Sequence, residues 1–230
     1  GMQAAFYQWI KNTIEGNFSR TTDGKIVAYD STNKPIRTLE FYDAQITEVT
    51  FPRLDASSKE AAAMTVQITP SATWSSSGGD PFPGTVSKTQ KKWLASNFRL
   101  AIDGVDMTKA SSVEALRVAI PLGYPQGIVC SIICPPPLAI NFPNVEVRLA
   151  SSFASSAIKW YEESVYNGFA EEKNGAIEYL TPDAKGVLFR LTLHNLGPIS
   201  IENDDGGSIA ATILRMYAEH MKFEIATGVN

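Results

Sequence analysis

The chain has 230 residues, of which 44% are hydrophobic and 19% charged, and its formal net charge is -4. This length suits one large or two small domains with a substantial core, and the composition disfavours intrinsic disorder. The lack of a basic excess disfavours tight nucleic-acid binding. No apolar run reaches the roughly 18 residues that cross a bilayer, and no secretory signal is evident, so we expect a soluble protein without a membrane partner.

The N-terminal segment FYQWIKNTIEGNF, residues 6–18, has apolar residues at three- and four-residue spacing. This spacing predicts a short amphipathic helix that ends at Gly16. The dipeptide Asp23–Gly24 that follows is typical of a hairpin turn. The segment PIRTLEFYDAQITEVTF then alternates apolar and polar residues, which predicts a long strand.

The same order of patterns returns later in the chain. A shift of 151 positions places Trp9 on Trp160 and Gly24 on Gly175. The second helical stripe ends at Gly168, Asn174–Gly175 again resembles a turn dipeptide, and VLFRLTLHNLGPISI alternates as a strand. The residues of this second stripe are Phe153, Ala157, Ile158, Tyr161 and Val165. We interpret the repeated order as a divergent internal duplication.

Residues 69–92 separate the two copies and are rich in Ser, Gly and Pro without periodicity, which predicts a long loop or linker. After it, NFRLAIDGVD predicts a strand and a turn at Asp103–Gly104, and SSVEALRVAI and NVEVRLA predict two more strands. The segment GSIAATILRMYAEHMKFEI fits a helix at its start and a strand at its end. Its secondary structure is therefore left open.

Neither cysteine is expected to form a disulfide or a metal site. Cys130 and Cys134 are four residues apart in an apolar segment. On a strand their Cα atoms would lie ~13 Å apart, beyond the reach of a disulfide. With no second cysteine pair nearby, they also make a poor zinc site, so we expect free, buried thiols.

Other residues with chemical potential have simple structural interpretations. His194 and His220 are 26 positions apart, and we expect both to face solvent or an interface rather than act as general bases. Asp204 and Asp205 are adjacent in ENDDGGS, which lacks the ligand spacing of a calcium loop and predicts a turn. Asp55 is expected to begin a turn or cap a helix.

The four tryptophans divide into two pairs. Trp9 and Trp160 lie on predicted buried helix faces, which favours core packing. Trp74 and Trp93 flank the predicted loop and remain open to partner binding. The sequence contains none of the common nucleotide-binding, hydrolase or metalloprotease motifs, so we predict no catalytic, cofactor-binding or metal-binding residue.

Several phrases in this order, from NFRLAIDGVD through VEVRLASSFASSAIKWYEESVYNGF, EEKNGAIEYL and LFRLTLHNLGPISI to ATILRMYAEHMKFEI, resemble the tail tube protein family of contractile bacteriophages. The resemblance covers residues 97–226, and the N-terminal part is similar to the second half of the same domain. It implies a mainly β fold, a tail-tube-like β-sandwich or barrel with packed short helices. By fold, the type VI secretion tube protein is a relative of this family.

The resemblance also implies a domain division and a function. We expect a partial tube-like unit at 2–68, a linker or arm at 69–92, and a tube-like domain at 93–230. The expected function is a non-catalytic structural component of a phage tail or phage-derived contractile injection apparatus. It would form rings of six chains, or of three chains with two units each, and contact other tail proteins.

The expected location is the virion tail, or the bacterial cytoplasm before assembly. The alternatives are a β-barrel module that binds a small molecule or glycan through long loops, and an enzyme whose residues converge only in the fold. Ring formation would favour the structural component, whereas a deep apolar pocket in a stable monomer would favour the binding module.

Overall fold

The computed structural model of the chain describes residues 4–16, 21–81, 93–121, 140–169, 171–204 and 210–225. Strands dominate, which confirms the predicted mainly β fold. The elements are α1 (Ala4–Ile14), β1 (Thr22–Tyr29), β2 (Pro35–Phe51), β3 (Leu54–Asp55), β4 (Thr65–Thr69), β5 (Ala72–Ser77), β6 (Phe98–Ile102), β7 (Ala110–Val113), β8 (Leu116–Ala119), β9 (Val145–Ala150), η1 (Ser151–Phe153), α2 (Ser155–Tyr161), the π-helix η2 (Glu162–Tyr166), β10 (Lys173–Leu180), β11 (Val187–Asp204) and β12 (Ala211–Ile225).

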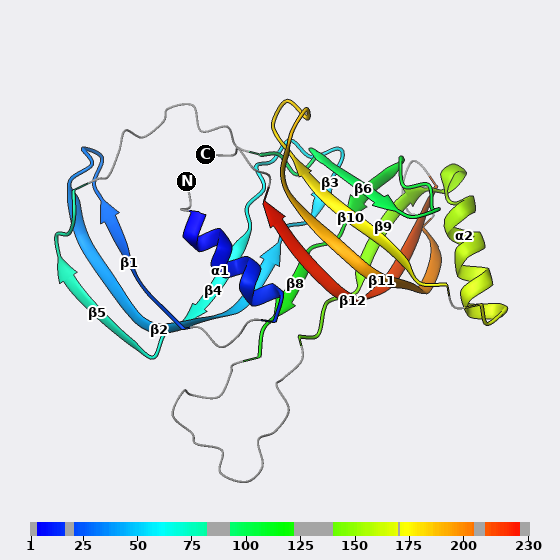
Figure 1. The fold of residues 1–230 in the computed structure, drawn as a ribbon. Helices are drawn as coiled ribbons and strands as arrows, with labels where there is room; N and C mark the ends of the chain where they lie inside the picture. Colours follow the sequence, from blue (N-terminus) through cyan, green and yellow to red (C-terminus); the bar gives the residue numbers. More distant parts are fainter. Residues whose placement is uncertain are drawn as a thin grey trace, which may run out of the picture.

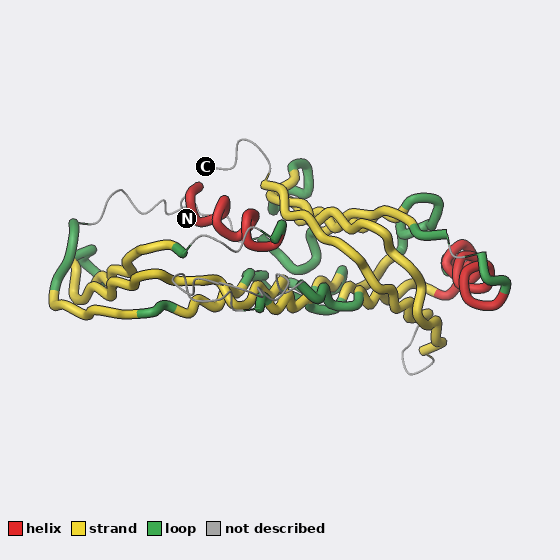
Figure 2. The backbone as a smooth tube through the Cα atoms, turned by 60° about the horizontal axis from the view of Figure 1, so that its bottom comes forward, coloured by secondary structure: helices red, strands yellow, loops and turns green. Residues whose placement is uncertain are grey.

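The described strands form two sheets. In the smaller sheet β2 is central and pairs with β1, β4, β5 and β8. The larger sheet has the order β3-β7-β9-β12-β11-β10-β6 and curls into a half-barrel (Figure 1). The molecule is elongated, with α2 at one end and the β1–β2 hairpin with β5 at the other (Figures 1 and 2). Helix α1 lies between these ends, over the junction of the two sheets (Figure 1).

The long strand β2 has the bounds that its alternating sequence predicts. It pairs with β1 and β5 along its first part, and with β4 and β8 along its second part. A register shift in the ladder with β4, between Ile46 and Glu48, changes which alternate residues of β2 face the core. Ile46 and Val49 are therefore both buried although they are three residues apart.

The segment that the sequence left open is a single strand, β12. It pairs with β11 from Ala211, opposite Asp204, to Ile225, opposite Phe189. Alternate residues such as Leu214 and Met216 are buried because only one face of the strand meets the core. The ladder with β11 thus overrides the helical spacing at the start of this segment.

Both helices end where a glycine was predicted to end them. Gly16 follows α1 with a φ of 86°, and Gly168 follows η2 with a φ of 70°. A residue with a side chain adopts this left-handed conformation at a cost, whereas glycine does so freely. The second helix has one residue more between its tryptophan and its glycine, and its last turn is the π-helix η2.

Of the three predicted turn dipeptides, Asp103–Gly104 is in a turn as predicted, but the other two are in strands, which corrects the sequence interpretation. Asp23–Gly24 lies within β1 and Asn174–Gly175 within β10. The hairpin turns follow these strands. The Asp30 amide donates to the Lys34 carbonyl at 2.9 Å in the first turn, and the Thr181 amide donates to the Gly186 carbonyl at 2.8 Å in the second.

The two dipeptides instead lie opposite β-bulges, in which the partner strand, β2 or β11, has one extra residue. The Asp23 carboxylate accepts a hydrogen bond from the Asp43 amide at 2.8 Å, and the Asn174 side-chain oxygen accepts one from the Asn195 amide at 3.4 Å. Asp43 and Asn195 have positive φ values of 48° and 52°. The Asx residue therefore caps a left-handed residue on the neighbouring strand, a role that calls for the same residue types as a turn.

These bulges show that the chain contains two units of the same construction. The first unit is α1, β1, β2, β4 and β5, and the second is α2, η2, β10, β11 and β12. The β1–β2 and β10–β11 ladders have register shifts at corresponding places, after Thr22 and Lys173 and before Tyr29 and Leu180. β4 and β5 together run along β2 as β12 runs along β11. This is the outcome expected of an internal duplication.

Two other sequence expectations need correction. Residues 72–77, within the predicted loop, form strand β5, whose side chains are all exposed. An exposed edge strand needs no apolar alternation, so its sequence gave no strand signal. SSVEALRVAI forms two strands, β7 and β8, which belong to different sheets.

The domain division at 2–68, 69–92 and 93–230 stays a prediction, and two strand pairings cross it: β3 with β7 and β8 with β2.

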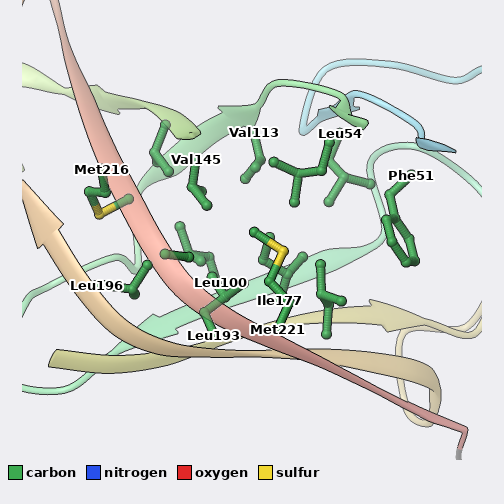
Figure 3. Close-up of a cluster of buried hydrophobic side chains, with 14 of the residues drawn as sticks. Phe51, Leu54, Leu100, Val113, Val145, Ile177, Leu193, Leu196, Met216 and Met221 are labelled. Carbon is green, nitrogen blue, oxygen red and sulfur yellow. The ribbon is translucent and has the colours of Figure 1, made fainter. Parts of the chain in front are cut away.

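The hydrophobic core joins both parts of the chain. Figure 3 shows Phe51, Leu54, Leu100, Val113, Val145, Ile177, Leu193, Leu196, Met216 and Met221 gathered in one cluster. The Phe51 ring lies 6.2 Å from that of Phe189 and 5.9 Å from that of Phe223, measured between ring centroids. Because Phe51 is fully buried at the end of β2, the smaller sheet is anchored in the core of the larger one.

Candidate assembly surfaces

The described residues contain no group of three or more His, Cys, Asp or Glu side chains that could hold a metal ion. None of the described helices is long and apolar enough to cross a membrane. Cys130, Cys134 and Asp205 lie outside the described residues.

The two histidines are neighbours in the fold, which their separation in sequence did not indicate. His194 on β11 is directly opposite His220 on β12, with 6.1 Å between ring centroids. Both are half-buried. Burial, together with the positive charge of Lys222 and the proximity of His220, lowers the pKa of His194 below its ordinary value of 6.5. The strand register alone creates this pair.

The acidic residues take structural roles. The Asp55 carboxylate accepts hydrogen bonds from the Ser57 amide at 2.9 Å and the Ser57 hydroxyl at 2.6 Å, which lower the pKa of Asp55. Asp55 thus begins a turn, as predicted. Asp204 was predicted to lie in a turn but is the last residue of β11, where it forms an ion pair with Arg148.

The tryptophans follow the prediction in part. Trp160 is buried, and its indole donates to the Glu171 carbonyl at 2.8 Å, while Trp9 packs partly buried against the core. Trp93 is partly buried and packs against the core, 5.1 Å from the Phe189 ring between ring centroids. Trp74 on β5 is 68% exposed.

An apolar pocket of about 270 Å³ lies where α1 meets the C-terminal end of β12. Its lining comes from α1, the segments before β4 and before β6, the start of β11 and the end of β12: Tyr7, Ala62, Ala63, Met64, Trp93, Leu188, Phe189 and Ile225. This lining contains no carboxylate, histidine, lysine or arginine. Since it lacks an acid–base pair, the pocket is suited to packing or to an apolar ligand rather than to proton transfer.

In the described part of the chain, three contacts between elements join the N-terminal part, α1 to β5, to the part that begins at residue 93. α1 of the first unit packs on β12 of the second. β8 pairs with β2, and β3 pairs with β7. Ion pairs follow the same junction: Arg117 on β8 with Glu48 on β2, and Arg53 after β2 with Glu114 before β8 at 2.9 Å. Because these ion pairs are mostly exposed, backbone pairing and apolar burial dominate the junction.

Strand edges that are covered in one unit are open in the other. β10 pairs with β6 and β12 pairs with β9, whereas the corresponding edges of β1 and β4 have no strand partner among the described residues. Conversely, β8 pairs with the end of β2, and the corresponding edge of β11, at Ser200–Asn203, has no such partner in the described ranges. Open edges are adhesive because their backbone amides and carbonyls remain available.

Exposed apolar side chains accompany the open edges. Ile26 on β1 is 57% exposed, whereas its counterpart Ile177 on β10 is fully buried. At the other end of the molecule Val165, Tyr166 and Phe169 are exposed at the end of the second helix. Neighbouring positions on one helix end that expose large apolar side chains are typical of an interaction surface.

The family model described as "T4-like virus tail tube protein gp19" matches residues 2–72. The predicted resemblance to tail tube proteins is thereby confirmed. The match covers α1 to β4 of the first unit, ends where β5 begins, and lies outside residues 97–226, where the resemblance was expected to be most complete. No curated protein sequence matches the chain.

Two solved structures are similar to this chain. Hcp1 from Flavobacterium johnsoniae is 12% identical, with a TM-score of 0.39 over 56% of this chain and 95% of that one. A chain of the anti-feeding prophage (AFP) baseplate, a 6-fold symmetrised cryo-EM structure, is 10% identical, with a TM-score of 0.35 over 79% of this chain and 94% of that one. Both scores are low, so the function proposed below rests on the family match and on the exposed surfaces.

Proposed function

We propose that the chain is a non-catalytic structural component of a phage tail or of a phage-derived contractile injection apparatus, where it works by assembling with other subunits. The observation that carries this proposal is the match of residues 2–72 to the tail tube family, in a unit whose strand edges and apolar residues are left open. Such surfaces suit a protein that completes its sheets with neighbouring subunits.

The expected assembly is a ring. β1 and β5 lie at one end of the elongated molecule and the second helix lies at the other, so the exposed surfaces at the two ends differ, which is the arrangement of a head-to-tail contact (Figures 1 and 2). Head-to-tail contacts close into rings when the rotation between subunits permits. A ring of six units requires three chains if both units of each chain take part, and six chains if one does.

In this role the partners are other copies of the chain and other tail or injection-apparatus proteins. The protein would then reside in the virion tail, and in the bacterial cytoplasm before assembly. The net charge of -4 and the absence of a basic excess favour a component that does not bind nucleic acid tightly.

Light scattering and negative-stain electron microscopy of the purified protein at several concentrations test the proposal. We expect closed rings, or short stacks of rings, whose population grows with protein concentration. A protein that stays monomeric at the highest concentrations, alone and with the other structural proteins of its tail, would contradict it.

The apolar pocket favours a second candidate, a binding module for an apolar small molecule. Fluorescence of Trp93, which lines the pocket, reports its occupancy. Saturable quenching by an apolar probe, lost in a variant with Ala63→Phe that fills the pocket, together with a protein that remains monomeric, would favour this candidate over the structural one.

A further inference from the structure

We propose that the end of the second helix of one chain packs along β5 of a second copy, in a head-to-tail contact that repeats the contact between α1 and β12 within the chain. This inference rests on the proposed function, and it identifies the two surfaces that join the copies. The helix surface is Val165, Tyr166 and Phe169, and the strand surface is β5 with Trp74.

The contact within the chain provides the template. α1 packs beside the C-terminal end of β12, past the stretch Ala211–Met216 that β9 covers (Figure 1). Ile10 and Ile14 of α1 are fully buried there and belong to the same core cluster as Phe223 of β12. Helix α1 therefore covers apolar surface of the other unit as well as of its own.

The second helix has no such cover at its end. Trp9 and Trp160 occupy the same position in the two helices, and each packs with the core. Toward the closing glycine, however, α1 ends with the fully buried Ile14, whereas η2 ends with Val165 at 46% and Tyr166 at 73% exposure. The end of the second helix thus presents the apolar surface that the first helix buries.

The strand that corresponds to the end of β12 is also uncovered. Ser77 of β5 is opposite Arg37 of β2, as Ile225 of β12 is opposite Phe189 of β11. All six residues of β5 are exposed, whereas the last six of β12 include the buried Met221 and Phe223. Within the described part of the chain β5 pairs only with β2, so its outer edge is open.

The two surfaces cannot meet within one chain because they lie at opposite ends of the molecule (Figures 1 and 2). In a pair of copies, the helix surface of one copy contacts the strand surface of the other. The strand surface of the first copy and the helix surface of the second then remain free. The contact is therefore heterologous and propagates to a ring or a filament. Its chemistry suits a reversible junction, since β5 carries Ser and Thr around the single large apolar residue Trp74.

Tyr166 and Trp74 belong to the residue types that contribute most binding energy at protein interfaces. Two variants test the contact, Trp74→Lys and Tyr166→Lys, with Ala115→Lys as a control. Ala115 is exposed between β7 and β8, away from both ends of the molecule.

We expect each of the two variants to weaken self-association roughly 30-fold or more, because a charge replaces a buried aromatic side chain at the contact. The control should associate as the unsubstituted protein does. Both side chains are largely exposed in the single chain, so the melting temperature should be unchanged. Should a lysine variant misfold, Trp74→Ala and Tyr166→Ala repeat the test without adding a charge.

Mixing the two variants gives the decisive result. The Trp74→Lys chain keeps an intact helix surface and the Tyr166→Lys chain an intact strand surface, so an equimolar mixture should form dimers while neither variant alone does. Rings that persist in both variants would overturn this contact and leave the proposed function standing. An unsubstituted protein that never assembles would overturn the proposed function and this contact with it.

Discussion

At the scale of single residues, the glycines Gly24 and Gly175 illustrate how the two units diverged. Both follow an Asx residue at a β-bulge, and neither has a positive φ. A Cβ on Gly175 would lie 2.7 Å from the Ala101 carbonyl oxygen of β6, whereas a Cβ on Gly24 would meet the tip of the Phe41 ring. One obstacle is backbone and the other is the end of a side chain.

We therefore predict that Gly175→Ala destabilises the protein by about 1–3 kcal/mol, because the β6–β10 ladder must shift. Gly24→Ala should cost less, since the half-buried Phe41 ring can turn aside. Urea unfolding of the two variants measures both values. An equal loss in the two variants would contradict the different packing of β1 and β10.

A pH dependence follows from the histidine pair. The folded protein holds the pKa of His194 below 6.5, so the unfolded chain binds the proton more readily. The contribution of His194 to the free energy of unfolding is then fully present above pH 6.5. It is lost as the pH falls from 6.5 through the pKa of His194 in the folded protein.

We predict that the free energy of unfolding falls across this window in the unsubstituted protein and falls less in His194→Gln. Denaturant unfolding at a series of pH values, with His220→Gln in parallel, provides the measurement. A slope that His194→Gln leaves unchanged would assign the effect to other groups.

At the scale of elements, local patterns predicted those features that depend on local chemistry. The alternation of apolar and polar residues was sufficient to predict β2 and β11, because burial on one face selects apolar residues at every second position. The glycines were sufficient to predict the ends of both helices, because a positive φ favours glycine. The dipeptides Asp23–Gly24 and Asn174–Gly175 were mistaken for turns because the same Asx–Gly chemistry serves a turn and a bulge.

Features that depend on pairing could not be predicted in the same way. β5 is a strand because β2 offers it a backbone ladder, and its Ser- and Thr-rich sequence has no apolar face to reveal this. The approach of His194 to His220 depends on the β11–β12 register. The open edges depend in the same way on which strands pair, as the contrast between the paired edge of β10 and the open edge of β1 illustrates.

A pair of substitutions at the ends of the two helices gives a prediction at this scale. Ile14 is fully buried at the end of α1, and Val165 is 46% exposed at the end of the second helix. Ile14→Ala should cost about 2–5 kcal/mol because it leaves a cavity in the core. Val165→Ala should change the stability of the single chain by less than about 0.5 kcal/mol. Thermal unfolding at low protein concentration compares them, and a large effect of Val165→Ala would mean that this residue already packs within one chain.

At the scale of the whole molecule, the N-terminal part of the chain, α1 to β5, depends on the part after residue 93 for its core. Phe51 and Leu54 are buried against side chains of the larger sheet, and β8 completes the edge of β2. The β1–β2–β5 end contributes mostly half-buried and exposed residues. The smaller sheet therefore buries too little apolar surface to offset its own conformational entropy.

We predict that a fragment of residues 1–81 does not fold alone, whereas co-expression with residues 93–230 restores a folded complex. Circular dichroism and amide-proton dispersion in NMR spectra distinguish the two cases. A cooperative thermal transition of the isolated fragment would show that the predicted boundary at 68 and 69 separates autonomous domains.

The presence of two units on one chain has a consequence for mass action. In a ring of six units built from three chains, three of the six junctions form during folding, at the high effective concentration of a single molecule. Only three junctions then depend on the concentration of free protein. Such a ring would nucleate at a lower subunit concentration than a ring assembled from six separate units. On dissociation, the junctions between chains would open first, and the junctions within each chain would stay closed.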